Sequence, residues 1–304
     1  MLVALALLLP WRPSSDGFVE YSATAARATA APTVSIVMPT HNRSRLLPHA
    51  CAMVAAQTRS DLELLVLDDT PGASGAARWR ALASTEGASA LGGRLRYFHR
   101  AATRGAGRAS VGAKRNLAAT RLARGEFVCV WDDDDYFPPT RLADALAPFE
   151  AAAGDGGAPP DALFIRGGVV YYNAETGEFL RPEPPLAPFH PNTMVYRRRL
   201  HTRACGYADA DFLEDAAFLR ALDAAGRGRG GDTLAARSAF VRTPWVHHRH
   251  RASVVVRRGE DPILYDGGGV GENRDGLARV SETDVMAETG LPRALLDEWR
   301  AGAV

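Results

Sequence analysis

The chain contains FVCVWDDDD from Phe127 to Asp135, in which an apolar run of the length of a buried strand is followed by four consecutive carboxylates. Such a strand delivers several carboxylates to one sheet edge, where like charges repel unless water or a cation compensates. Oxygen ligands favour Mg2+ or Mn2+ over Zn2+, and Mg2+ is typically held by one or two carboxylates plus substrate phosphates. The stretch therefore predicts a metal-diphosphate site. The alternative is an acidic turn that caps a helix beginning near Thr140.

The composition is that of an ordinary soluble globular protein. The chain has 304 residues, 46% hydrophobic and 23% charged, which suits one large domain or two small ones. A formal net charge of +1 gives no basic field for a nucleic acid. Cys51, Cys129 and Cys205 are widely spaced and odd in number, which argues against a disulfide framework and a zinc site.

The apolar segment from Met1 to Pro10 is too short to span a bilayer, which takes roughly 20 apolar residues. A short signal peptide, the remnant of a membrane anchor and a misplaced start codon all stay open, because no basic residue precedes the segment. Residues 14–32, rich in Ser, Ala and Thr, are predicted to form a linker. The compartment is open between the secretory pathway or Golgi lumen and the cytoplasm, and membrane association is open too.

Strand and helix patterns alternate in the first half of the chain. Apolar or β-branched runs predict strands at 34–38, 62–67, 94–98 and 127–131, with helices at 46–56 and 109–124. This alternation predicts a doubly wound, mostly parallel α/β sheet. Ligands of such sheets collect outside the carboxyl ends of the strands, where three polar clusters fall: residues 40–42, 68–69 and 132–135.

The pattern changes after Glu150. Further strands are predicted at 163–172, 178–180, 192–196 and 241–246, the first two as a hairpin about 173–177. Helices are predicted at 211–225, with Glu214 and Asp215 in the first turn, and at 291–299. We expect an N-terminal segment and linker over 1–32, one domain over 33–253 and a tail of unknown role over 254–304.

Residues 105–110, GAGRAS, match part of the fingerprint of a dinucleotide-binding site. The segment has the first two glycines of the Rossmann fingerprint but Ser110 in place of the third. It also follows the third predicted strand, whereas the fingerprint belongs to the first strand-to-helix turn. The segment is therefore interpreted as a loop before a helix.

Five motifs, in their order and spacing, resemble glycosyltransferase family 2. They are VSIVMPTHNR at 34–43, ELLVLDD at 63–69, GAKRN at 112–116, ARGEF at 123–127 and WDDDD at 131–135. The similarity runs from about Val34 to Ser253. It implies the GT-A fold, a Rossmann-like sheet with a small acceptor-side β/α extension, and a nucleotide-diphosphate sugar as donor.

The resemblance also implies which residues hold that donor: Pro39, Thr40, Asn42, Asp69, Lys114, Asp132 and Asp133. Thr40 and Asn42 would face the nucleoside, and Asp69 would accept a hydrogen bond from the imide of a uracil-like ring. Asp68 is expected to hold the loop instead. Lys114 and Arg115 would meet phosphate, with a solvated helix end as the alternative.

The metal ligands that the resemblance implies are Asp134, Asp132 and His248, for Mn2+ or Mg2+. Asp134 would bind the metal itself, and Asp132 the ribose or a metal-bound water. Asp135 is expected to stabilise the loop. His248 would complete the metal shell or touch diphosphate, with a surface histidine as the alternative, since Arg251 replaces the Asn that the family usually has there.

Glu214 and Asp215 resemble the acidic pair of the same family. Inverting transfer needs one carboxylate to take the acceptor hydroxyl proton while the metal stabilises the departing diphosphate. Asp215 is assigned the base role and Glu214 a supporting one. The alternative is an acidic pair that interacts with the helix dipole.

These predictions describe a hexosyltransferase-type enzyme of carbohydrate biosynthesis. It would be an inverting, metal-dependent glycosyltransferase that uses a UDP-sugar rather than a GDP-sugar and an acceptor hydroxyl on a glycan, lipid or protein. Acceptor contacts are expected within residues 160–210, with Tyr171, Tyr172, Asn192, Thr193, Phe189 and Tyr207 as candidates. The alternatives are a nucleotidyltransferase on a related sheet and a non-catalytic nucleotide- or sugar-binding homologue.

Overall fold

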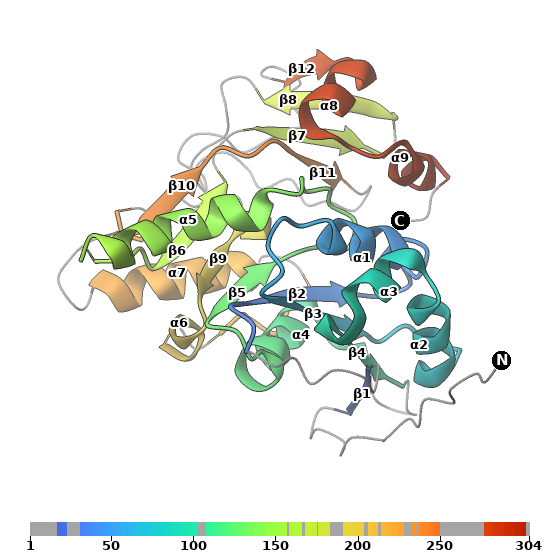
Figure 1. The fold of residues 1–304 in the computed structure, drawn as a ribbon, viewed down its shortest axis with the longest axis horizontal. Helices are drawn as coiled ribbons and strands as arrows, with labels where there is room; N and C mark the ends of the chain where they lie inside the picture. The colour runs from blue at the N-terminus through green and yellow to red at the C-terminus, as the bar shows by residue number, and fades with distance from the viewer. Residues whose placement is uncertain are drawn as a thin grey trace.

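The computed structural model describes residues 17–22, 31–101, 108–156, 158–165, 168–174, 176–182, 191–203, 206–211, 214–227, 233–234, 236–249 and 277–301. Among them, eight strands form one sheet in the order β1-β4-β3-β2-β5-β9-β6-β10 (Figure 1). Strands β4, β3, β2 and β5 are parallel, whereas β1 and β9 run antiparallel to their neighbours. The strands are β1 Phe18–Ser22, β2 Val34–Thr40, β3 Leu62–Asp68, β4 Leu95–Arg100, β5 Phe127–Val130, β6 Ala162–Ile165, β9 Val195–Arg197 and β10 Ser238–Val241.

Helices cover both faces of this sheet, as the alternation in the sequence predicts. Alternate side chains of one strand enter opposite cores: Ile36 packs with α1 (Leu47–Ala55) and α5 (Arg141–Gly154), and Val37 with α4 (Val111–Leu117) and α7 (Glu214–Arg227). In Figure 1, α1 lies above β2 and α4 below it. The remaining helices that pack on this sheet are α2 Gly75–Ala83, α3 Glu86–Leu91 and α6 Arg199–Arg203. The doubly wound α/β prediction is confirmed.

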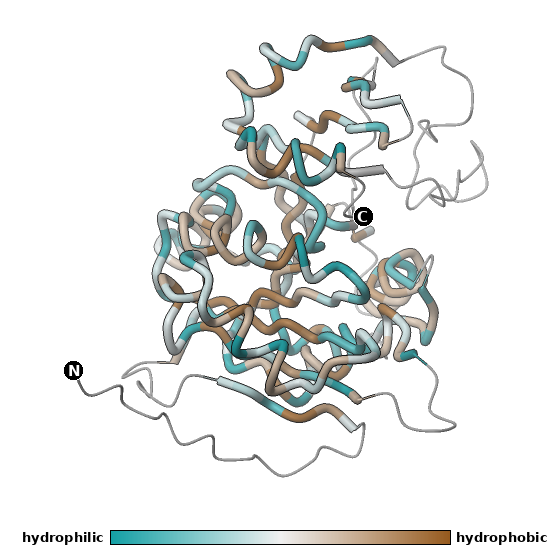
Figure 2. Tube along the Cα trace, turned by 90° about the vertical axis from the view of Figure 1, so that its right-hand side faces the viewer, coloured by the Kyte–Doolittle hydropathy of each residue, from teal (hydrophilic) through white to brown (hydrophobic). Residues whose placement is uncertain are grey.

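A smaller sheet lies beside the first, with four described strands in the order β11-β7-β8-β12. Its strands are β7 Val169–Asn173, β8 Glu178–Pro182, β11 Trp245–Arg249 and β12 Leu277–Val280. Helices α8 (Glu282–Thr289) and α9 (Arg293–Arg300) pack on it, and Trp299 of α9 stacks on Tyr172 with 5.2 Å between ring centroids. Figure 2 shows hydrophobic segments inside both layers and hydrophilic ones in many of the connecting loops.

Two predicted single strands are in fact divided between the two sheets. Residues 163–172 form the end of β6 and the start of β7, and residues 241–246 form the end of β10 and the start of β11. The segments that lead from the large sheet to the small one lie side by side, because Trp245 N donates to Gly168 O at 3.1 Å. Gly168 has a φ of +69°, and a Cβ there would come within 3.1 Å of the Thr243 and Pro244 backbone. Each predicted strand is interrupted because these two segments pair with each other. The local sequence pattern does not show this pairing.

Two further predictions are corrected. The predicted linker 14–32 contains β1, which pairs antiparallel with β4. The predicted helix 109–124 is α-helical only over Val111–Leu117 and continues as a π-helical turn over Ala118–Leu122. Helices α1, α7 and α9 confirm the predicted helices at 46–56, 211–225 and 291–299. No helix in the described parts of the chain combines the length and the apolar character that crossing a membrane requires.

Candidate active site

The carboxyl ends of β2, β3 and β5 bring the predicted polar clusters to one edge of the large sheet. The three strands are parallel neighbours, with Thr40 opposite Asp68 and Val37 opposite Val130. Side chains then join the clusters across the strands. His41 Nδ1 lies 2.8 Å from Asp69 Oδ1, and Arg43 Nη1 donates to Asp133 Oδ1 at 2.8 Å. The clusters therefore form one continuous polar site.

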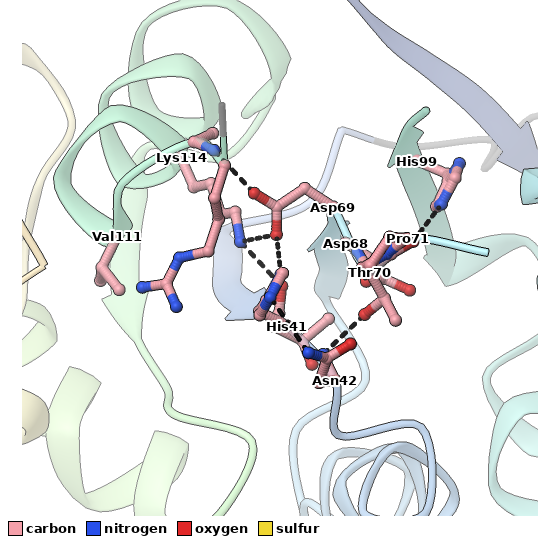
Figure 3. A network of polar contacts seen from close by, with 12 residues as sticks. His41, Asn42, Asp68, Asp69, Thr70, Pro71, His99, Val111 and Lys114 are labelled. Carbon is pink, nitrogen blue, oxygen red and sulfur yellow. Dashed lines mark hydrogen bonds and ion pairs between the residues drawn. The ribbon is translucent and has the colours of Figure 1, made fainter. Parts of the chain in front are cut away.

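Asp69 lies at the centre of the hydrogen-bond network drawn in Figure 3. Its Oδ1 accepts from Lys114 Nζ at 2.6 Å and faces His41, and its Oδ2 accepts from the backbone N of Ala109 at 2.7 Å. Burial opposes the ionised form, but the Lys114 ammonium outweighs it and holds the pKa of Asp69 below its ordinary value. Asp69 is therefore a fixed carboxylate anion.

Lys114 is buried, with 2% of its side chain exposed, so the solvated helix end is wrong for this residue. Its ammonium also donates to Thr40 O at 2.8 Å, which ties helix α4 to the end of β2. Burial lowers the pKa of Lys114, and the carboxylate of Asp69 opposes that shift.

The loops that follow β2 and β3 support each other. Asp68 accepts from Thr70 N at 2.8 Å and from Tyr97 Oη at 2.5 Å, which confirms its expected role in holding the loop. Asn42 has a φ of +57° and its backbone N donates to Thr70 Oγ1 at 2.7 Å. The exposed Asn42 side chain thus stands at the rim of the site, while Pro39 is buried inside β2.

Each aspartate of the turn after β5 is paired with a basic side chain from another part of the chain. The pairs are Asp132 with Arg115 at 2.8 Å, Asp133 and Asp134 with Arg43 at 2.8 and 3.1 Å, and Asp135 with His247 at 2.8 Å. Burial raises the pKa of Asp133 to about 6 and raises that of Asp135 as well. Asp135 also faces Asn192 Nδ2 at 3.4 Å, in agreement with its expected loop-stabilising role.

The acidic pair at the start of α7 is joined to this turn through one guanidinium. Arg115 Nη1 donates to Glu214 Oε1 at 2.5 Å and its Nη2 to Asp132 Oδ1 at 2.8 Å. Burial raises the pKa of Glu214 to about 7 and raises that of Asp215. A carboxyl group whose pKa is raised towards neutrality is suited to proton transfer.

Gly112 explains why α4 and α7 can approach so closely. A Cβ at this position would lie 1.8 Å from Ala208 O and 3.2 Å from Glu214 Cβ. The backbone N of Gly112 donates to Ala210 O at 3.0 Å. The GAKRN motif therefore places Arg115 next to Glu214 because its first residue has no side chain.

Arg43 and His247 are site residues that the sequence analysis missed. Arg43 ends the first motif but was given no role, and His247 stands next to the predicted ligand His248. Only alternate residues of a strand share a face, so the register decides which histidine meets the aspartates, and register cannot be read from the sequence. Asp135 raises the pKa of His247 against the effect of burial. The His248 side chain lies outside the described residues, although its backbone pairs with Tyr172.

Most of the acceptor candidates that the structure describes are core residues. Tyr171, Tyr172, Thr193 and Tyr207 are buried, and Tyr207 stacks on Phe218 with 4.3 Å between ring centroids. Asn192 is half-buried beside the aspartate turn, and Phe189 lies outside the described residues.

The carboxylate oxygens of the aspartate turn suit a hard cation that takes its other ligands from a bound phosphate. Within the described residues, no group of three or more His, Cys, Asp or Glu side chains is arranged to hold a metal ion alone. Mg2+ and similar ions need only one or two carboxylates when phosphates supply the rest. Asp134 and Asp132 belong to neighbouring positions of the same turn and supply such oxygens.

Comparisons with known proteins place the chain among glycosyltransferases. The model of the family described as Glycosyl transferase family 2 matches residues 35–203. The chain is 36% identical over 117 residues to the putative colanic acid biosynthesis glycosyl transferase WcaA of Escherichia coli (strain K12), a match that spans 38% of this chain and 37% of that protein.

Among solved structures, the chain is similar to the mannosyltransferase PcManGT from Pyrobaculum calidifontis in complex with GDP-Man and Mn2+. The identity is 20%, the TM-score 0.47, and the match covers 76% of this chain and 59% of that one. It is also similar to glucosyl-3-phosphoglycerate synthase from Mycobacterium tuberculosis in complex with Mn2+, UDP and glucosyl-3-phosphoglycerate, with 16% identity, a TM-score of 0.45 and coverage of 72% and 73% of the two chains.

Proposed function

The chain belongs to glycosyltransferase family 2 and has its GT-A fold, and from this premise we propose that it is an inverting, metal-dependent enzyme that transfers a sugar from a UDP-sugar to an acceptor hydroxyl. The observation that carries the proposal is the Arg115 bridge. It holds Glu214, beside the base Asp215, within one hydrogen-bonded unit with the aspartate turn. A proton acceptor and a diphosphate site are thus held at fixed positions in the same site.

Asp69 recognises the nucleobase of the donor. A carboxylate has about four lone-pair positions, and three on Asp69 face His41, Lys114 and Ala109 N. The one that is left suits the single imide N–H of uracil. Guanine presents two adjacent N–H donors and needs two acceptor positions, so this geometry favours UDP over GDP.

The half of the site that holds the diphosphate lies at the aspartate turn. Asp134, with Asp132 beside it, would hold the metal, and His248 is the further candidate ligand. A divalent metal bound there neutralises the charge that develops on the leaving diphosphate. Pro39, Thr40, Asn42 and Asp133 belong to the donor side of the site, where the buried Asp133 acts through its contact with Arg43.

Asp215 takes the proton of the acceptor hydroxyl. The acceptor oxygen then attacks the anomeric carbon from the face opposite the diphosphate, the new C–O bond forms, and the bond to the diphosphate oxygen breaks. UDP leaves with that electron pair, and the sugar is transferred with inversion. Glu214 orients Arg115, whose guanidinium compensates the negative charge of the acidic pair.

The test is a screen of nucleotide sugars with Mn2+ and candidate acceptors, in which free UDP or GDP is measured. We expect UDP release that requires Mn2+ and is abolished by Asp134→Ala, while Asp61→Asn, at a half-exposed carboxylate paired with Arg59, serves as the control. Release of GDP alone would refute the proposal that Asp69 selects uracil. UDP binding without turnover on any acceptor would favour a non-catalytic binding protein.

A further inference from the structure

The guanidinium of Arg43 contacts two carboxylates of the aspartate turn. Its Nη1 is 2.8 Å from Asp133 Oδ1 and 3.1 Å from Asp134 Oδ2, so one nitrogen is shared by two adjacent carboxylates. The Arg43 side chain is 28% exposed, whereas those of Asp133 and Asp134 are 1% and 6% exposed. The guanidinium therefore lies on the solvent side of both carboxylates.

Two neighbouring buried carboxylates without a cation would be unstable. Asp133 and Asp134 are 1% and 6% exposed, and like charges so close repel each other unless a cation lies beside them. An arginine guanidinium keeps its charge in proteins, and the Nη1 of Arg43 lies within 3.1 Å of both carboxylates. The chain thus supplies from its first motif the positive charge that the turn needs.

We propose that Arg43 is an internal competitor of the metal at Asp134. This inference rests on the proposed metal site. In the metal-free protein the guanidinium compensates Asp133 and Asp134 together; when a divalent cation binds, Nη1 gives up Asp134 and keeps Asp133. Metal binding without nucleotide is thereby weakened, because the ion must displace one cation and stay close to it. The diphosphate of the donor carries the negative charge that compensates both cations, so donor and metal bind cooperatively.

The experiment compares Mn2+ binding to the full chain without nucleotide, measured as free Mn2+ by electron paramagnetic resonance. Removing one unit charge near a divalent ion in a hydrated site should tighten Mn2+ binding in Arg43→Gln on the order of tenfold. Arg43→Lys keeps the charge and should stay close to wild type. The matched control is Arg59→Gln. Arg59 also bridges two carboxylates, Asp61 and Glu150, and its side chain is 23% exposed against 28% for Arg43, but it lies before the start of β3.

A second readout is thermal unfolding. Arg43→Gln should melt at a lower temperature than wild type in EDTA and should gain more from added Mn2+, since the ion then supplies the missing charge. If this variant is unfolded in EDTA, the same inference requires Mn2+ to refold it. A variant that stays unfolded with Mn2+, or that binds Mn2+ no more tightly than wild type, overturns the inference.

Asp134→Asn separates this inference from the proposed function. If it abolishes Mn2+ binding while Arg43→Gln fails to tighten it, the metal site stands and the competition by Arg43 is refuted. If Asp134→Asn binds Mn2+ as wild type does, the metal site itself is wrong. The UDP-dependent gain in Mn2+ affinity should also be smaller in Arg43→Gln than in wild type.

Discussion

Replacing Arg115 by lysine tests whether one guanidinium holds the two halves of the site together. The two nitrogens of Arg115 donate to Glu214 and Asp132, which lie on different elements. A lysine ammonium is a single point donor on a flexible stem and cannot reproduce the planar fork. Arg115→Lys therefore keeps the charge but holds one carboxylate at a time.

The size of the effect follows from the burial of the pair. A hydrogen bond to a charged group contributes about 1.5–3 kcal/mol, and Arg115 and Glu214 are both almost fully buried, so little solvent screening applies. We expect Arg115→Lys to lower the free energy of unfolding by about 2 kcal/mol. Arg59→Lys is the control: Arg59 bridges Asp61 and Glu150, which are 39% and 58% exposed, and should cost less than about 1 kcal/mol.

Urea unfolding gives the two free energies, and UDP release gives kcat for the same samples. Turnover should fall more than UDP affinity, because the carboxylate that loses its guanidinium is free to move away from the reacting atoms. If Arg115→Lys and Arg59→Lys lose equal stability and neither changes kcat, the bridge does not position the site and the argument from it fails.

Three further predictions concern single residues. Asp215→Asn should keep UDP binding while transfer falls by a factor on the order of 10² to 10⁴, and Glu214→Gln should fall less; near-normal turnover in Asp215→Asn would leave the reaction without its base. Asp134→Ala should abolish the Mn2+-dependent gain in UDP affinity in calorimetric titrations, whereas Asp135→Ala should keep much of it, and equal losses would mean that the ligands are misassigned. Burial lowers the pKa of His201 to about 4, so the unfolded chain binds the extra proton and stability should fall as pH drops from about 6.5 to 4, by on the order of 3 kcal/mol. Urea unfolding of His201→Gln should show a flatter pH dependence there, and an unchanged slope would contradict this account.

The parts of the fold that the sequence predicts are those that local patterns determine. Leu62–Asp68 is buried along its whole length and is preceded and followed by polar residues, so its strand and its carboxyl end could both be recognised. The same reasoning placed Asp69 and the aspartate turn at one edge. The break at Gly168 could not be found in this way, because it depends on the backbone of Thr243 and Pro244 far along the chain.

The pairings inside the site could not be predicted for the same reason. Lys114 pairs with Asp69, 45 residues away, Arg43 with Asp133, 90 residues away, and Arg115 with Glu214, 99 residues away. A motif shows which charged groups are present, but only the packing of the elements shows which of them meet. The sequence therefore showed most of the anions of the site and two of its cations, Lys114 and Arg115, but not the carboxylates that these two meet, and it gave Arg43 and His247 no role.

The charge pairs of the site determine what a substitution at one of their members does. Each motif supplies a charge that another motif compensates: Lys114 for Asp69, Arg43 for Asp133, and Arg115 for Glu214. Removing one partner of a buried pair leaves an uncompensated charge, which costs about 3–5 kcal/mol and exceeds the net contribution of the pair. An alanine variant at any of these positions can thus lose activity because the fold around the site weakens. Catalytic roles here are best tested with variants of similar size, such as Asp215→Asn, in samples whose unfolding free energy has been measured alongside turnover.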